Sequence, residues 1–290
     1  AQALMREARS AFAEMGATAL VEYADERTEA LRANMHARLQ AHDKVSRELA
    51  VAGRIQEGLL PEEVPEIDGW QLAADLEPAR ETSGDFYDFI PLPDGHLCLV
   101  VADVADKGAG AALYMALSRT LIRTYAARFP EQPDLVLSST NQRILDETHT
   151  GMFVTVFYGV LNPRTGAFRY CNAGHNPPIL LQADGTCTLG RTGLPLGILE
   201  DAAWEAKEVR LAPGNALVIY TDGVTEAQAR DGVLFGQGRL QGVIETQRGA
   251  GGATEVTARD LQEAVLAAVH EFVGDAPRFD DLTLMVVSRT

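Results

Sequence analysis

The residues best suited to chemistry in this sequence are aspartates at the ends of short, strand-like apolar runs. Residues 97–102 read Leu-Cys-Leu-Val-Val-Ala and are followed directly by Asp103. A carboxylate at the end of a buried strand is costly unless a cation meets it. A single such residue could be a helix N-cap or a turn residue. The arrangement recurs, however, at three further aspartates: Asp85, Asp222 and Asp280.

Converging carboxylates repel one another and need cations between them. Because no Cys or His lies directly beside these aspartates, we expect two Mg²⁺ or Mn²⁺ ions rather than structural zinc. Two such ions, held about 3.5–4 Å apart, activate a bridging water and hold a phosphate for in-line attack. Arg80 and Lys107 lie near Asp85 and Asp103 in the sequence and could bind that phosphate; a surface-charge role is equally open for each.

Length and composition indicate one large catalytic domain with an appendage, since the chain has 290 residues, 46% of them hydrophobic and 23% charged. The net charge of −16 argues against nucleic acid as a partner. No apolar run of about 18 residues and no basic amphipathic stretch occurs, so we expect no membrane insertion. The first residues do not read as a signal peptide, and the three scattered cysteines fit buried thiols in a reducing cytoplasm, the expected location.

The composition divides the chain into residues 1–60, a predicted helical regulatory linker, and residues 61–290, the predicted catalytic domain. The first segment has no proline before Pro61 and is dense in good helix formers. Small and apolar residues recur loosely at helical spacing, but Arg38 and His42 interrupt the stripe, so a strict coiled coil is not established. A helix packed on its own domain and a signalling stalk that dimerises are both open.

The remaining chain reads as short strands joined by turns, with helices inserted in pairs. Helices are expected over 108–128 and 133–148, and residues 162–166 form a hairpin loop between two strands. There is no regular strand–helix–strand alternation. This pattern predicts an α+β fold with a mostly antiparallel sheet.

Ten ordered segments together resemble the bacterial PP2C-like (PPM) serine/threonine phosphatases of the RsbU/SpoIIE type. They cover the chain from residue 55 to its end and comprise residues 55–61, 84–88, 103–108, 111–115, 152–155, 172–175, 195–197, 220–227, 235–236 and 280–283. A single short segment would be a weak signal, whereas the ordered set is specific. The resemblance implies an αββα sandwich of two antiparallel sheets flanked by helices, with metals at one end.

The resemblance also implies roles for the aspartates. Asp103 would bridge both metal ions, and the backbone carbonyl of Val104 would be a further ligand. Asp85 would serve one ion, while Asp222 and Asp280 would serve the other.

Several neighbouring residues have weaker assignments. Asp88 and Asp281 would bind outer-shell waters or a third ion, and Arg80 falls where related phosphatases place a phosphate-binding arginine. His175, in a tight loop, is expected to be a hydrogen-bonded structural residue rather than a general acid. Glu226 is expected to be an exposed loop acid.

The chain departs from the family pattern at two places. Family members often have Gly-Gly-Asp where this chain has Ser83-Gly84-Asp85, and Ser-Gly where it has Ala105-Asp106. If position 106 requires a positive φ, aspartate tolerates it less well than glycine. Neither change removes a predicted metal ligand.

Taken together, the residues and the resemblance predict a metal-dependent protein phosphatase. It would hydrolyse phosphoserine or phosphothreonine by direct attack of a metal-bridging hydroxide, and its substrate would be an anti-sigma-factor antagonist. The N-terminal helices would connect to a sensor domain or regulator, dimerise, and alter how Asp85 and Asp103 are positioned. Two alternatives are a catalytically silent, phosphatase-like binding module and a small-molecule phosphoesterase.

Overall fold

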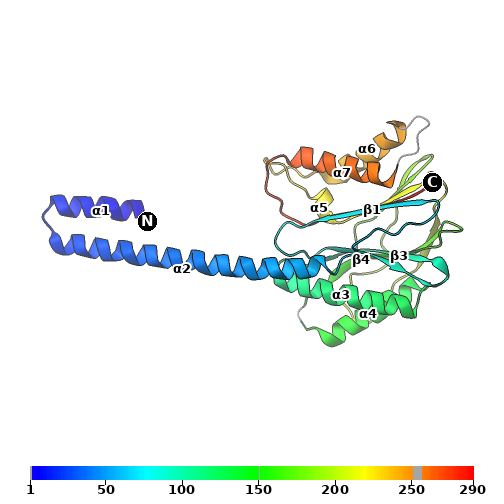
Figure 1. Ribbon diagram of the computed structural model, residues 1–290, viewed down its shortest axis with the longest axis horizontal. Coiled ribbons are helices and arrows are strands. Elements are labelled where there is room, and N and C mark those ends of the chain that lie inside the picture. The colour runs from blue at the N-terminus through cyan, green and yellow to red at the C-terminus, as the bar shows by residue number, and fades with distance from the viewer. Residues whose placement is uncertain (1, 150, 251–256) are drawn as a thin grey trace. The chain divides into compact units, whose positions relative to one another are not determined.

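The computed structural model describes residues 2–149, 151–250 and 257–290, and the chain separates into two compact units, Ala1–Val51 and Ala52–Thr290. In the first unit, α1 (Gln2–Glu14) turns through Gly16 into α2 (Thr18–Glu57), the last turns of which belong to the second unit (Figure 1). An ion pair between Arg9 and Asp25 joins the two helices, with Nε and Oδ1 2.5 Å apart. The N-terminal segment is therefore helical, as expected.

Apolar side chains are exposed along α2 in the first unit. Leu20, Tyr23, Met35, Leu39 and Val45 each have between 46% and 58% of their surface open to solvent. Among the described residues, no helix is long and apolar enough to cross a bilayer. Helix α2 thus carries scattered apolar side chains that are open to solvent in this unit.

The second unit contains two five-stranded antiparallel sheets. The first has the order β1-β10-β9-β6-β7 and the second the order β2-β3-β4-β5-β8. The strands of the first sheet are β1 (Trp70–Glu77), β10 (Leu282–Arg289), β9 (Ala216–Tyr220), β6 (Ile179–Gln182) and β7 (Gly185–Thr188). Those of the second are β2 (Phe86–Pro91), β3 (Leu97–Val104), β4 (Val154–Leu161), β5 (Ala167–Ala173) and β8 (Lys207–Arg210).

Two pairs of helices cover the outer faces of these sheets (Figure 1). The helices are α3 (Ala109–Arg128) and α4 (Pro133–Glu147) on the second sheet, and α6 (Gly236–Ala250) and α7 (Ala258–Val273) on the first. A 3₁₀ turn, η1 (Pro93–Gly95), joins β2 to β3, and the short helix α5 (Asp222–Thr225) follows β9. The predicted α+β fold and four-layer sandwich are confirmed.

The continuous apolar run of β3 is explained by burial on both of its faces. Leu99 and Val101 point into the core between the sheets, whereas Cys98 and Val100 point toward α3 and α4. Successive side chains on a strand face opposite sides, so a strand covered on both sides needs apolar residues at every position. The rigid layers on either side fix the position of the strand's last residues, including Asp103.

Candidate active site

The antiparallel register of the second sheet brings two of the predicted aspartates together. Phe86 of β2 pairs with Ala102 of β3, so Asp85, just before β2, lies beside Asp103, near the end of β3. The two carboxyl groups are close enough for the charge of Asp103 to raise the pKa of Asp85. Residues separated by eighteen positions in sequence therefore meet at one end of the sandwich because of strand pairing alone.

The first sheet brings the other two aspartates to the same end. Leu284 of β10 pairs with Tyr220 of β9, so Asp280, before β10, and Asp222, after β9, lie at neighbouring strand ends. The charges of Asp222 and Asp280 both act on Asp103 of the opposite sheet. The four aspartates predicted from the sequence thus form one group, which we call the acidic cluster: Asp85, Asp103, Asp222 and Asp280.

Asp85 is the most enclosed member of the acidic cluster, with 3% of its surface exposed. The hydroxyl groups of Thr221 and Thr283 donate to its Oδ2 atom at 2.7 and 2.6 Å, which ties the two sheets together. Burial, and then the charge of Asp103, raise the pKa of Asp85, and the two threonine hydrogen bonds oppose that rise. These threonines could not be identified from the sequence beyond their place beside the strand-end aspartates.

The negative charges of the acidic cluster are not fully balanced by nearby positive side chains. Burial, followed by the charges of Asp222 and Asp280, raises the pKa of Asp103 to about 7. Burial, followed by Asp280 and Glu226, raises the pKa of Asp222 to about 6. Such raised values mean that the ionised cluster is costly without added cations.

Lys107 reaches the acidic cluster from the loop after β3. Its ammonium group lies 2.8 Å from Oδ2 of Asp280 and donates to the backbone carbonyl of Phe279 at 2.6 Å. The preceding residue, Asp106, has a φ of 98°, and its Oδ1 accepts a hydrogen bond from the Lys107 amide. The structure therefore places Lys107 as the partner of a predicted metal ligand.

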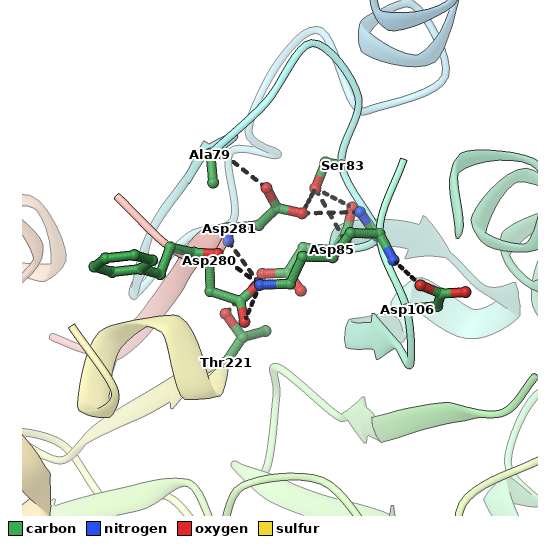
Figure 2. Close-up of polar contacts among 10 residues, drawn as sticks. Ala79, Ser83, Asp85, Asp106, Thr221, Asp280 and Asp281 are labelled. Atoms are coloured by element: carbon green, nitrogen blue, oxygen red, sulfur yellow. Dashed lines mark hydrogen bonds and ion pairs between the residues drawn. The ribbon is translucent and has the colours of Figure 1, made fainter. Parts of the chain in front are cut away.

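Asp281 fastens the loop that leads to Asp85. One oxygen of its carboxylate accepts from the Ala79 amide at 2.7 Å, and the other accepts from the Ser83 hydroxyl and the Gly84 amide, both at 2.8 Å (Figure 2). Both oxygens are thus engaged by the protein, while the charge of Asp281 also acts on Asp85 and Asp103, and its outer-shell or third-metal role stays a prediction. Its observed role is to position the 79–84 loop.

Val104 lies against the same loop. Its amide donates to the Gly84 carbonyl at 3.4 Å, and a Cβ on Gly84 would lie 3.1 Å from the Val104 carbonyl oxygen. Because a side chain at position 84 would crowd that carbonyl, glycine suits this position. The backbone of Val104 and the entry to Asp85 are thus in direct contact.

Asp88 lies apart from the acidic cluster. Nη1 of Arg123 donates to both of its oxygens at 2.6 and 2.7 Å, and Nη2 of Arg119 lies 3.0 Å from Oδ2. Burial raises the pKa of Asp88, and the two guanidinium groups oppose that rise. Asp88 therefore joins β2 to α3 through two arginines, and its outer-shell or third-metal role stays a prediction.

The C-terminal end of α2 is hydrogen-bonded to the 79–84 loop. Gln56, 7% exposed, donates from Nε2 to the Ser83 carbonyl at 2.5 Å and accepts from the Ser83 amide at 2.9 Å. A Cβ on Gly53, one turn earlier, would lie 1.9 Å from the Glu81 carbonyl oxygen, so the helix and the loop are in close contact. Both residues of the helix lie in or beside the matched segment 55–61, but the sequence does not show what they touch.

A cleft of about 400 Å³ opens beside the acidic cluster. Asp103 and Asp222 lie on its wall together with Arg191, Glu226 and Gln237. Glu226 is exposed, as expected, but it borders the cleft rather than a remote surface. Arg191 was not identified by the sequence analysis.

Arg80, the arginine predicted to bind phosphate, is exposed on the 79–84 loop. Among the described residues, it is not one of those that line the cleft. His175 lines the cleft but is only 1% exposed, and its Nδ1 atom lies 2.8 Å from the Thr155 hydroxyl. Burial lowers the pKa of His175 to about 3, so the ring is neutral near pH 7 and fits the expected structural role.

The acidic cluster has the donor chemistry of a site for hard divalent cations. All four side chains offer carboxylate oxygens, which Mg²⁺ and Mn²⁺ prefer. In the described part of the chain, no three Asp, Glu, His or Cys side chains are arranged as a complete ligand set. The pairing of Asp280 with Lys107 indicates that its carboxylate must turn to meet an ion. The raised pKa values at Asp103 and Asp222 show that positive charge would stabilise the cluster, so the residues fit such ions.

Comparisons with known proteins agree with this arrangement. Residues 93–290 match the family described as Stage II sporulation protein E (SpoIIE). The chain is 31% identical over 251 residues to the phosphoserine phosphatase RsbU of Bacillus subtilis, covering 85% of this chain and 71% of that protein. It is 32% identical over 278 residues to Protein IcfG of Synechocystis sp., covering 86% of this chain but only 43% of IcfG.

A solved structure supports the fold independently. The SiaA-PP2C domain of Pseudomonas aeruginosa superposes with a TM-score of 0.74 at 21% identity, covering 87% of this chain and 98% of that domain. At this level of identity the likeness concerns the fold alone.

Proposed function

The chain belongs to the SpoIIE family of PP2C-like phosphatases, and on that premise we propose that it is a metal-dependent protein phosphatase. It would hydrolyse phosphoserine or phosphothreonine on a partner protein. The observation that carries the proposal is the convergence of four aspartates from two sheets, in which burial and like charge raise the pKa of Asp103 to about 7. An acidic cluster beside an open cleft is a site for cations and a charged substrate.

In this proposal two Mn²⁺ or Mg²⁺ ions are held by Asp85, Asp103, Asp222 and Asp280, with the carbonyl of Val104 as a further ligand. When bound, the ions supply a water activated for direct attack on phosphorus and neutralise charge on the phosphate. The protein's own residues hold the ligands in place.

The supporting side chains act on Asp85 and its loop. Thr221 and Thr283 orient the Asp85 carboxylate through the oxygen that they bond. Asp281 and Gln56 hold the backbone of Ser83 and Gly84, two residues away or less. Small displacements of this loop would therefore move a predicted metal ligand.

That dependence supports regulation through the N-terminal helices. Gln56, which is hydrogen-bonded to Ser83, and Gly53, which packs against Glu81, bring helix α2 into contact with the loop before Asp85. We therefore propose that a sensor domain or regulator acts on the helical segment, and that the exposed apolar side chains of α2 pair in a homodimer. The prediction that residues 1–60 act as a separate linker belongs to this same proposal.

The proposed substrate is a small phosphorylated protein of the anti-sigma-factor-antagonist type. The similarity to RsbU, whose name is phosphoserine phosphatase, supports the phosphoserine part of this statement. Because this chain has a net charge of −16, we expect the partner's contacting surface to be neutral or positively charged. A cytoplasmic location remains part of the same proposal.

The test is hydrolysis of an aryl phosphate with Mn²⁺, with EDTA, and by the Asp103→Asn variant. Metal-dependent turnover that is lost in the variant would support the proposed site. Partner binding without any metal-dependent turnover would instead support the silent binding module. Faster turnover of free phosphoserine than of a phosphoserine-containing protein would favour the small-molecule phosphoesterase.

A further inference from the structure

We propose that Arg191 binds the phosphate group of the substrate, an inference that rests on the proposed phosphatase function. Arg191 lies in the segment between β7 and β8 and lines the cleft that also contains Asp103 and Asp222. A phosphoester that occupies this cleft would therefore contact the acidic cluster on one side and a guanidinium group on the other.

Arg191 is the only lysine or arginine among the described residues that line the cleft. His175, the other basic side chain there, is buried, and its pKa is lowered to about 3, so it adds no positive charge. A phosphate dianion needs positive charge, and the planar guanidinium group matches its oxygens with two parallel hydrogen bonds. Among the described residues that line the cleft, Arg191 is therefore the side chain that can offer positive charge to an anionic substrate.

The guanidinium group of Arg191 is also available. Within the described residues, no hydrogen bond or ion pair engages its side chain, although Glu226 borders the same cleft. The nearby Lys107 differs, because its ammonium group is already paired with Asp280. Five donor groups without protein partners leave Arg191 free to bind a ligand.

The backbone around Arg191 is fixed although the side chain is exposed. On one side, the Leu189 amide donates to the Pro178 carbonyl at 2.9 Å, and the Leu189 side chain is 3% exposed. On the other side, the Thr192 amide donates to the Asn172 carbonyl at 2.8 Å, and the Thr192 hydroxyl accepts from the Asn172 amide at 2.9 Å. Two anchored neighbours hold the Arg191 backbone at the cleft, so only its side chain has to be ordered when a ligand binds.

The experiment measures binding of inorganic phosphate to the full chain with Mg²⁺ by titration calorimetry, for the wild type, Arg191→Gln and Arg191→Lys. Loss of a charge-assisted hydrogen bond predicts that Arg191→Gln raises the Kd of phosphate by about 10- to 100-fold. Arg191→Lys keeps the charge but not the paired hydrogen bonds, so its Kd should fall between the other two. Arg164→Gln, in the hairpin loop after β4, is the matched control and should bind like the wild type.

Aryl phosphate hydrolysis by the same proteins separates the two proposals. We expect KM to rise with the phosphate Kd in Arg191→Gln, while the thermal midpoint of unfolding stays at the wild-type value. Phosphate binding that is absent from the wild type, or unchanged in Arg191→Gln, would overturn the role of Arg191. Weakened phosphate binding in Arg191→Gln with no turnover by any protein would retain Arg191 and refute the phosphatase.

Discussion

Replacing Asp103 with asparagine should stabilise the metal-free protein at pH 8, although it removes a predicted metal ligand. The reason is that ionised Asp103 lies among the carboxylates of Asp85, Asp222 and Asp280 in a mostly buried position. Asparagine has nearly the same shape and carries no charge. The substitution therefore removes repulsion while leaving the packing of the strand end almost unchanged.

The pKa values set the size of this effect. The pKa of Asp103 is raised from 3.8 to about 7, and each pKa unit corresponds to about 1.36 kcal/mol, which gives an upper limit of about 4 kcal/mol at pH 8. Neighbouring carboxyl groups share this repulsion and can retain protons, so we expect about half, or ~2 kcal/mol. For a domain of this size that gain corresponds to a rise of about 4–8 °C in the unfolding temperature.

The pH dependence has a definite sign. A carboxyl group whose pKa is higher in the folded than in the unfolded chain favours folding when protonated, and this advantage is lost as pH rises through the folded-state pKa. The unfolding temperature of the wild type in EDTA should therefore fall between about pH 4 and pH 7 relative to that of Asp103→Asn. Below about pH 4, where the group is protonated in both states, the wild type keeps the advantage of its protonated carboxyl.

Thermal unfolding followed by circular dichroism at pH 5 and pH 8, with EDTA or Mn²⁺, tests the reasoning. Asp88→Asn is the control, because Asp88 is also a strand aspartate of the second sheet but is buried between Arg119 and Arg123. It should destabilise the protein by about 1–3 kcal/mol, since asparagine cannot accept all the hydrogen bonds that the two guanidinium groups donate to Asp88. Equal destabilisation by both variants in EDTA, or equal stabilisation of the wild type and Asp103→Asn by Mn²⁺, would refute the argument.

Two further predictions concern the neighbours of the acidic cluster. Lys107→Met frees the carboxylate of Asp280, and because exposed ion pairs contribute up to about 1 kcal/mol, the affinity for Mn²⁺ in a metal titration should rise about two- to fivefold. An unchanged or weaker affinity would show that the ion pair does not compete with the metal. Gln56→Ala removes two hydrogen bonds to Ser83 and should lower the free energy of unfolding by about 1–3 kcal/mol and speed hydrogen exchange at the Ser83 amide. Arg54→Ala, on an exposed position of the same helix, should leave that exchange rate unchanged, and protection of Ser83 retained in Gln56→Ala would contradict the proposed contact.

The sequence was sufficient to predict the acidic cluster because chain order, strand pattern and residue type all agree there. A buried strand such as residues 97–102 is recognisable by its apolar run, and an aspartate at its end conflicts with that setting. Repetition of the conflict at Asp222 and Asp280 pointed to a shared site. The antiparallel fold follows from the same short runs and turns, which is why it could be predicted together with the cluster.

The roles of Asp88, Asp281 and Arg191 could not be predicted, because they depend on contacts between distant segments. Asp88 and Asp281 both adjoin predicted ligands in sequence, but one side chain faces α3 and the other faces the 79–84 loop. Arg191 lies in no recognised motif. Its relation to the cleft arises from the packing of the segment after β7 against the end of β5, which no local pattern encodes.

The 79–84 loop connects these observations, because three parts of the chain act on it. Asp281 binds it from the position just before β10, Gln56 binds it from α2, and Val104 contacts it from the end of β3. The loop leads directly to Asp85, whose pKa is raised by burial and by Asp103. If the position of α2 alters the affinity of the acidic cluster for metal, linkage requires that metal binding alter the preferred position of α2 by the same factor. Hydrogen exchange around Gln56 would then slow when Mn²⁺ is added to the wild type but not to Asp103→Asn, and the same response in both proteins would show that helix and cluster are independent.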